Sequence, residues 1–149
     1  MATGIEDKKT VDNLLDEIKF GSKRAWIGKR FHFDAAHFLP LHRGKCANLH
    51  GHRWFLDLEL EGPINSEGMV IDFGLLSPYI ETILSKLDHN ELNKEVANPT
   101  AENLCWYLTN QISINWPRDF PFLTLSLVKV WETDTAFAMV RPNLYLRNE

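Results

Sequence analysis

The stretch His50–Glu61 alternates between apolar and polar residues more regularly than any other part of the chain. Its apolar side chains stand two positions apart, at Trp54, Leu56, Leu58 and Leu60. Residues two apart on a β-strand point to the same face of a sheet, so the pattern predicts a strand with one buried and one polar face. Gly62-Pro63 ends the pattern. The chain is therefore expected to contain a sheet, around which its other elements are placed.

Three more segments are predicted to be strands. The segment Trp26–Phe38 alternates well enough for a strand, with Ile27, Phe31, Phe33 and Ala35 on the same parity as His37. Two final strands are expected at Phe122–Thr133 and from Ala136 to about Leu146, joined by a tight connection. The short apolar run Met69–Phe73 is a candidate to extend the sheet.

Two helices are predicted between the pairs of strands. The first begins near Ser77-Pro78, because a serine N-cap followed by proline at the first helical position is a typical helix start. The second begins at Asn98-Pro99-Thr100 and ends at Trp116-Pro117. The residues expected on their buried sides are Ile80, Ile83, Leu84 and Leu87 in the first helix, and Leu104, Leu108 and Ile112 in the second.

The predicted order strand-strand-helix-helix-strand-strand indicates an α+β fold. Two hairpins give an antiparallel four-stranded sheet, and both helices cover one face. The other face and the sheet edges would be exposed in a monomer, so we expect the chain to oligomerise. Residues 1–24 are predicted to form an extension with a short amphipathic helix, and residues 25–149 to form the main domain.

Charge and composition exclude several classes of protein. A net charge of −4 and a pI of about 5.9 do not provide the basic surface of a nucleic-acid-binding protein. No apolar run approaches the roughly 20 residues needed to cross a membrane. The segment Met1–Thr10 is charged and lacks the apolar core of a secretory signal. With both cysteines expected to be free thiols, these features predict a cytoplasmic protein.

Five of the six histidines fall between residues 32 and 52. In His50-Gly51-His52 both rings point to the same side of a strand and can reach one ion. His37 ends the preceding strand on its apolar parity, and three histidines with an open position are typical of catalytic zinc. His32 and His42 are weaker candidates. The alternative is a set of core histidines that are satisfied by backbone carbonyls.

Four more residues are candidates for chemistry. Cys46 lies in a loop with two basic residues, which favour its thiolate, so it is either a base or a fourth zinc ligand. Asp88-His89 follows the first helix and is either a functional pair or a solvated helix end. Glu132 lies on the apolar parity of its strand, so it must be paired or face a ligand unless it turns to solvent.

These candidates belong to six motifs that occur in this order: Phe33–His37, Cys46–His52, Val70–Gly74, Leu87–Asn93, Pro99–Leu104 and Trp131–Thr133. Together they closely resemble the family of 6-pyruvoyl-tetrahydropterin and 6-carboxytetrahydropterin synthases. The resemblance runs from about Trp26 to the C-terminus. It implies the tunnelling fold, or T-fold, whose subunits form ring-shaped trimers that stack into hexamers with active sites at subunit interfaces.

The resemblance also implies a role for each candidate residue. The three zinc (Zn²⁺) ligands would be His37, His50 and His52. Cys46 would be the base that removes a proton. Asp88 and His89 would complete a proton relay, supplied across a subunit boundary. Glu132 would anchor the pterin, whose amino-pyrimidinone edge offers adjacent N–H groups to a carboxylate.

The spacing between Cys46 and His50 is similar to the branch that forms 6-carboxytetrahydropterin for queuosine and other deazapurines. The implied activity is a lyase reaction that converts 7,8-dihydroneopterin triphosphate to 6-carboxy-5,6,7,8-tetrahydropterin, releasing triphosphate and acetaldehyde. Arg43 and Lys45 are candidate contacts for the triphosphate. The alternatives are the pyruvoyl-forming synthase of tetrahydrobiopterin synthesis, which stops earlier, and a non-catalytic scaffold stabilised by zinc.

Overall fold

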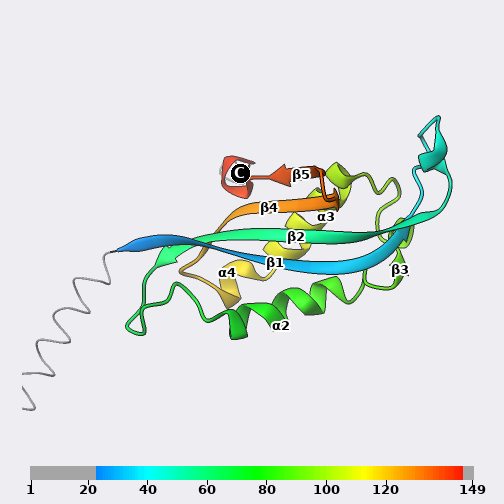
Figure 1. Cartoon of the computed structure of the whole chain (residues 1–149). Helices are drawn as coiled ribbons and strands as arrows, with labels where there is room; N and C mark the ends of the chain where they lie inside the picture. Colours follow the sequence, from blue (N-terminus) through cyan, green and yellow to red (C-terminus); the bar gives the residue numbers. More distant parts are fainter. Residues whose placement is uncertain (1–22, 146–149) are drawn as a thin grey trace, which may run out of the picture.

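A computed structural model describes residues 23–145 of the chain (Figure 1). Its centre is a five-stranded sheet in the order β3-β1-β2-β4-β5. The strands are β1 (Arg24–His37), β2 (His50–Pro63), β3 (Asn90–Glu91), β4 (Thr124–Thr133) and β5 (Ala136–Val140). The helices are α2 (Phe73–Leu84), α3 (Ala101–Ser113), α4 (Trp116–Asp119) and α5 (Pro142–Tyr145), with single 3-10 turns η1 (Lys45–Ala47) and η2 (Leu92–Lys94). The predicted N-terminal helix lies outside the described residues.

The predicted α+β architecture is confirmed, with one additional strand. The four long strands pair antiparallel, and α2 and α3 lie on one face of the sheet (Figure 1). The unpredicted strand β3 runs parallel to β1 and pairs only with Ala35 and Ala36. A strand of two residues is too short to show alternation, which explains why the sequence pattern missed it.

The core lies between the sheet and the two long helices. All four apolar side chains of the alternating stretch in β2 are at most 1% exposed. Helix α2 contributes Leu76, Ile80 and Leu84 to this core, and α3 contributes Leu104, Leu108 and Ile112. Burying one leucine side chain stabilises a fold by about 1.5–3 kcal/mol, so this layer is the main source of stability.

The start of the first helix is a correction. Helix α2 begins at Phe73, where Asp72 caps it by accepting a 2.7 Å hydrogen bond from the Gly74 N–H. The segment Met69–Phe73, a candidate to extend the sheet, is not a strand, and its last residue is the first of α2. Pro78 therefore lies inside the helix, in its second turn, where its ring removes one backbone hydrogen bond without ending the helix.

The second helix begins as predicted, with Thr100 accepting a hydrogen bond from the Asn103 N–H at 3.1 Å. Its end is a correction, because α3 stops at Ser113 and Trp116-Pro117 opens the separate helix α4. The last strand is shorter than predicted as well. It ends at Val140, and the proline at position 142 starts α5.

The face of the sheet opposite the helices is open in the described chain. It carries cross-strand ion pairs between arginine and carboxylate side chains, among them Arg30 with Asp57 and Arg53 with Asp34. Aromatic side chains lie between these pairs, and Phe137 is 47% exposed there. Within residues 23–145, no helix is long and apolar enough to cross a membrane.

Candidate metal centre and its surroundings

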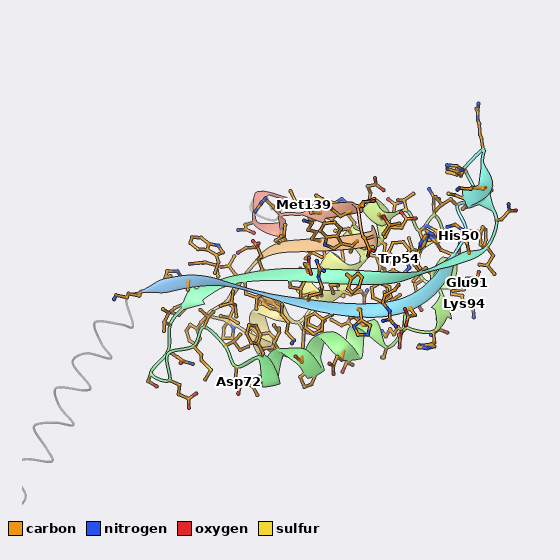
Figure 2. The ribbon with its side chains drawn as sticks, viewed as in Figure 1. His50, Trp54, Asp72, Glu91, Lys94 and Met139 are labelled. Carbon is orange, nitrogen blue, oxygen red and sulfur yellow. The ribbon has the colours of Figure 1, made fainter. Side chains whose placement is uncertain are left out.

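Three strands bring the predicted histidines together at one end of the sheet. The antiparallel register places His37 directly opposite His50, and Ala35 opposite His52. Glu132, near the end of β4, joins them. The donor atoms of His37, His50, His52 and Glu132 all lie within 4.8 Å of one another. Figure 2 shows His50 at this end, on the strand that also carries the core residue Trp54.

The ring nitrogens that face away from this cluster are bonded to backbone carbonyls. Nδ1 of His37 donates to the carbonyl of Pro99 over 2.8 Å, and Nδ1 of His50 donates to the carbonyl of Asn48 over 2.7 Å. A carbonyl only accepts, so Nδ1 carries the hydrogen in both rings and Nε2 of each neutral ring keeps a lone pair. The two Nε2 atoms are 3.1 Å apart. Two lone pairs at this separation repel one another unless a proton or a cation lies between them.

A proton is the less favourable solution, because the rings are shielded from water. His37 is fully buried, and burial lowers its pKa and that of His52. The indole of Trp54 packs edge-on against both rings, with centroids 5.0 Å from His37 and 5.4 Å from His52. Burial therefore favours the neutral form of both imidazoles, which is the form that binds a metal.

The third imidazole has a buried nitrogen with no hydrogen-bond partner. Nε2 of His52 lies 3.3 Å from Oε1 of Glu132, but the orientation does not make a hydrogen bond. The same carboxylate oxygen is 3.6 Å from Nε2 of His37. Buried polar atoms are rarely left unpaired in native proteins. Three imidazoles and a carboxylate that converge in this way fit a divalent transition-metal ion.

The remaining histidines of the predicted stretch lie outside this group. His42 is used in a turn, where its Nδ1 accepts a hydrogen bond from the Gly44 N–H over 2.9 Å. His32 is exposed and points to the opposite side of β1 from His37. Both are the weaker candidates in the sequence, and neither belongs to a group of converging donor atoms among the described residues.

Cys46 lies on the short turn η1, in the loop that joins β1 to β2. The base of this loop is closed by a hydrogen bond from the Leu39 N–H to the Cys46 carbonyl, at 2.8 Å. The thiol is partly buried and free. Among the described residues it belongs to neither cluster of candidate metal donors. Its assignment as a base stays a prediction.

The pair Asp88–His89 is hydrogen-bonded within the single chain. Oδ2 of Asp88 lies 2.9 Å from Nδ1 of His89, and Oδ1 of Asp88 accepts from the Asp34 N–H, also at 2.9 Å. These bonds lower the pKa of Asp88, and the bond from the Asp34 N–H contributes more than the bond to His89. The carboxylate therefore stays charged. Nε2 of His89 is left for another partner, and the side chain is 80% exposed. The pair is thus formed, and its role as a relay stays a prediction.

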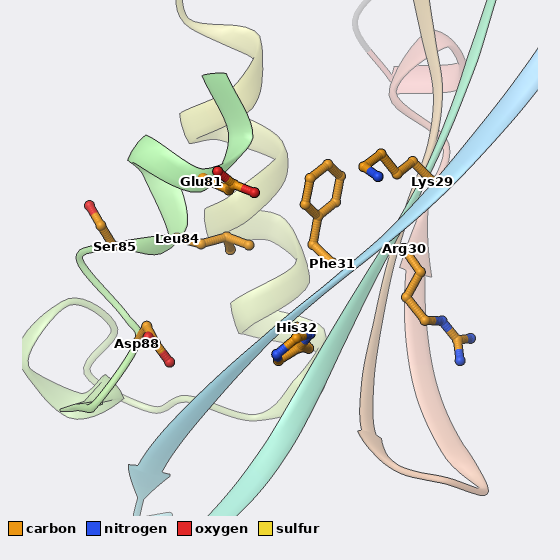
Figure 3. Close-up of a pocket in the computed structure, with 8 residues that line it drawn as sticks. All are labelled: Lys29, Arg30, Phe31, His32, Glu81, Leu84, Ser85 and Asp88. Atoms are coloured by element: carbon orange, nitrogen blue, oxygen red, sulfur yellow. The ribbon is translucent and has the colours of Figure 1, made fainter. Parts of the chain in front are cut away.

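The two clusters lie at the same end of the sheet without sharing donor atoms. His89 and His52 line one cavity of about 490 Å³, together with Gly51, Glu91 and Lys94. Figure 2 shows Glu91 and Lys94 at this end of the sheet, near His50. Asp88 lines a second cavity of about 380 Å³, between β1 and the end of α2 (Figure 3).

Two supporting residues were not singled out in the sequence. Asn93 accepts from the N–H of Phe38 at 3.0 Å and donates to its carbonyl at 2.8 Å, which fixes the chain directly after His37. Pro99 supplies the carbonyl that orients His37. Both lie in the sequence motifs Leu87–Asn93 and Pro99–Leu104, but only the structure shows that they hold the end of β1 and the ring of His37.

Comparison with known proteins gives consistent results. The model of one protein family, described as 6-pyruvoyl tetrahydropterin synthase, matches residues 26–143. A 6-carboxy-5,6,7,8-tetrahydropterin synthase of Haemophilus influenzae is 33% identical over 138 residues, covering 74% of this chain and 94% of that protein. A putative enzyme of the same name from Archaeoglobus fulgidus is 32% identical over 115 residues, covering 77% of this chain and 94% of that protein.

Two other relatives extend the range of activities. A dihydroneopterin monophosphate aldolase of Pyrococcus furiosus is 38% identical over 109 residues, covering 73% of this chain and 90% of that protein. Among solved structures, the 6-pyruvoyl tetrahydropterin synthase of Caenorhabditis elegans matches with a TM-score of 0.70 and 25% identity. That match covers 82% of this chain and 98% of the nematode protein.

Proposed function

The chain belongs to the 6-pyruvoyl tetrahydropterin synthase family, and from this premise we propose that it is a zinc-dependent 6-carboxytetrahydropterin synthase. It is a lyase-type enzyme that acts on a pterin triphosphate. The proposed reaction converts 7,8-dihydroneopterin triphosphate and water to 6-carboxy-5,6,7,8-tetrahydropterin, triphosphate and acetaldehyde. The two hydrogens gained by the ring come from the side chain, so no external reductant is needed.

The observation that carries this proposal is the group of converging, unsatisfied imidazoles. His37, His50 and His52 would hold the zinc ion, and the carbonyls of Pro99 and Asn48 orient two of their rings. A bound zinc ion would supply a Lewis acid that polarises hydroxyl groups of the substrate and stabilises negative charge beside them. Burial against Trp54 keeps water from the inner side of the group.

The remaining candidates would handle protons and hold the ring. The thiolate of Cys46 would take a proton from a C–H group of the substrate side chain. His89, held at Nδ1 by Asp88, would return a proton through its exposed Nε2. Glu132 would accept hydrogen bonds from the N–H groups of the pterin. Because Glu132 lies beside His52, the alternative is that its carboxylate is a fourth ligand of the metal.

We further propose a homo-oligomer, a hexamer built as a dimer of trimers, in which Asp88 and His89 serve the metal centre of a neighbouring subunit. Two features support this proposal. Among residues 23–145, the outer edge of β1 is paired only at Ala35 and Ala36, so within this part of the chain most of the strand edge is open to a partner. The donor atoms of the Asp88–His89 pair also form a group separate from the three imidazoles within one chain.

Two neighbouring activities compete with the proposed one. The pyruvoyl-forming synthase eliminates triphosphate but keeps all carbon atoms of the side chain. A dihydroneopterin monophosphate aldolase is favoured by the 38% identity of the Pyrococcus furiosus enzyme. It would cleave a carbon–carbon bond of the monophosphate without releasing triphosphate. A non-catalytic scaffold is the remaining alternative, and it requires Cys46 on the metal.

Product analysis of the zinc-loaded protein tests these alternatives. We expect incubation with 7,8-dihydroneopterin triphosphate to yield triphosphate, acetaldehyde and a pterin with the mass of the 6-carboxy compound. A pterin that retains the full side chain would assign the pyruvoyl branch. Turnover of the monophosphate alone would assign the aldolase, and no turnover of either substrate would favour the scaffold. A carboxy product would support a role in queuosine or deazapurine synthesis in the cytoplasm, where both cysteines remain thiols.

A further inference from the structure

One residue of β1 makes backbone contacts to both members of the Asp88–His89 pair. The N–H of Asp34 donates to Oδ1 of Asp88 at 2.9 Å, and the carbonyl of Asp34 accepts from the N–H of His89 at 2.6 Å. The next two residues of β1 pair with β3, which follows His89 directly. The segment that carries the pair is therefore fastened to the edge of β1 at consecutive positions.

The backbone of His89 adopts a conformation that requires this fastening. Its φ angle is +57°, and it is the one non-glycine residue between residues 23 and 145 with a positive φ. Left-handed backbone is unfavourable for a residue that carries a side chain, and it persists where neighbouring contacts determine it. Here the contact is the short hydrogen bond to Asp34, which directs the ring of His89 to its place beside Asp88.

The side chain of Asp34 faces the same pair and is itself held by an arginine. Its two oxygens accept hydrogen bonds from Nε and Nη2 of Arg53, at 2.9 Å and 3.0 Å. Arg53 is the cross-strand partner of Asp34 on β2, directly after His52. One donor atom each of Asp34, Asp88 and His89 lie within 4.8 Å of one another. Hydrogen bonds already occupy both carboxylates of this group, so it is not arranged as a second metal site.

We propose that Asp34 and Arg53 form a positioning pair for the Asp88–His89 relay. The pair fixes the edge of β1 against which the relay is docked, and it joins that edge to the strand that carries His50 and His52. Its two opposite charges are joined by two hydrogen bonds next to the relay, so that replacing either residue alone changes the net charge beside His89. This inference rests on the proposed relay, and the experiment below separates the two.

The charged groups around His89 come from every neighbouring element. Asp88 precedes it, Asp34 and Arg53 lie on β1 and β2, and Glu91, Lys94 and His52 line the same cavity. Removing either member of the positioning pair leaves the other charge uncompensated. Loss of Arg53 leaves a negative charge that favours the imidazolium, whereas loss of Asp34 leaves a positive charge that disfavours it.

The test is an NMR titration of the His89 ring in the zinc-loaded protein, with ¹³C-labelled histidine and a His89→Gln variant to assign the signal. We expect Arg53→Gln to raise the pKa of His89 and Asp34→Asn to lower it, each by about half a unit for a solvent-exposed charge a few ångströms away. The double variant should return close to the wild-type value. Arg53→Lys keeps the charge and should leave the pKa nearly unchanged.

A matched control comes from the far end of the same sheet. Arg24 and Glu61 form a similar two-bond ion pair between β1 and β2, away from His89. Arg24→Gln should therefore leave the titration of His89 unchanged. Zinc content is measured in every variant, because Arg53 is adjacent to His52. The pH profile of kcat should shift in the same direction as the NMR value, with KM unchanged.

The proposal would be overturned if the pKa of His89 shifted in the same direction in Arg53→Gln and Asp34→Asn, or in neither variant. A purely structural role does not predict shifts of opposite sign. A double variant that departs further than both single variants would overturn the charge cancellation. The proposed relay fails by a different result, namely normal turnover in His89→Gln. In that case the NMR titration would still test whether Asp34 and Arg53 position the ring of His89.

Discussion

The two clusters of histidine and carboxylate at the end of the sheet differ in how well their polar atoms are satisfied. In the group of His37, His50, His52 and Glu132, the nitrogens that face inward lack a partner or face another lone pair. In the group of Asp34, Asp88 and His89, both carboxylates and the inner ring nitrogen are hydrogen-bonded. The first group is buried or half-buried, whereas the His89 side chain is largely exposed.

This difference indicates two kinds of chemistry. An inward-facing set of imidazole nitrogens beside a carboxylate is completed by a metal ion, which removes the repulsion between the lone pairs without protonating a buried ring. A fully bonded pair that presents one free ring nitrogen to solvent is prepared to exchange protons. The same residue types thus serve different purposes, and the distinction lies in burial and in hydrogen bonding on the far side of each ring. Four substitutions can break or sharpen this distinction.

The largest effect is expected for His50→Ala. Removing one of three converging imidazoles should abolish stoichiometric zinc binding and with it all detectable turnover. Metal content after gel filtration is the measurement. His42→Ala is the matched control, since that ring is bonded to the Gly44 N–H and lies outside the cluster. Full zinc occupancy in the His50 variant would remove His50 from the ligand set.

Cys46→Ala tests whether the thiol lies outside both clusters. We expect kcat to fall by roughly 10²–10⁴-fold, the usual contribution of a general base, while zinc content stays unchanged. Cys105→Ala is the control, because burial raises the pKa of that thiol to about 12 and makes it inert. Loss of zinc on replacing Cys46 would instead make the sulfur a ligand and the centre structural.

Asp88→Asn tests the fully bonded cluster. Its amide oxygen can still accept from the Asp34 N–H, so the segment should stay in place while the partner of His89 changes from acceptor to donor. We expect kcat to fall by about 100-fold with zinc retained, in line with other carboxylates that orient a histidine. Asp72→Asn, at the cap of α2, should have no effect on turnover. Unchanged kcat in Asp88→Asn would refute the relay.

Glu132→Gln has the smallest expected effect and tests whether Glu132 anchors the pterin or binds the metal. Loss of a charge-assisted hydrogen bond should weaken binding of a pterin product by roughly tenfold, with zinc content intact. Glu59→Gln, on the open face of β2, is the control for a lost carboxylate. Loss of zinc in the Glu132 variant would make this residue a fourth ligand, and unchanged pterin affinity would end its role as an anchor.

The sequence predicted those parts of the fold that depend on long periodic segments. The strand around Trp54 and the helix capped by Thr100 are confirmed because alternation and capping act locally. The start of α2 was placed wrongly, since Ser77-Pro78 imitates a helix start whereas Asp72 provides the actual cap. Strand β3 exists only through its pairing with β1, which no local pattern encodes.

The candidate site divides in the same way. The convergence of His37 with His50 and His52 was predicted, because parity and the antiparallel hairpin determine it. The approach of Glu132 to the imidazoles was not predicted, since it depends on the register of β2 with β4, which contains an irregularity after Glu59. By its position in the sequence pattern, Asp34 is an ordinary solvent-facing residue of a strand. Only its contacts with Asp88 and Arg53 indicate a role at the site.

The carbonyl of Pro99 connects the candidate metal centre to the helical layer. It holds the ring of His37 and immediately precedes Thr100, the residue that caps α3. An ion bound to His37 thus restrains the first turn of a helix that packs over the sheet. Chelation should therefore lower the melting temperature and increase hydrogen exchange at the start of α3 as well as in the strands, because a ligand that binds only the folded state stabilises every element coupled to its site.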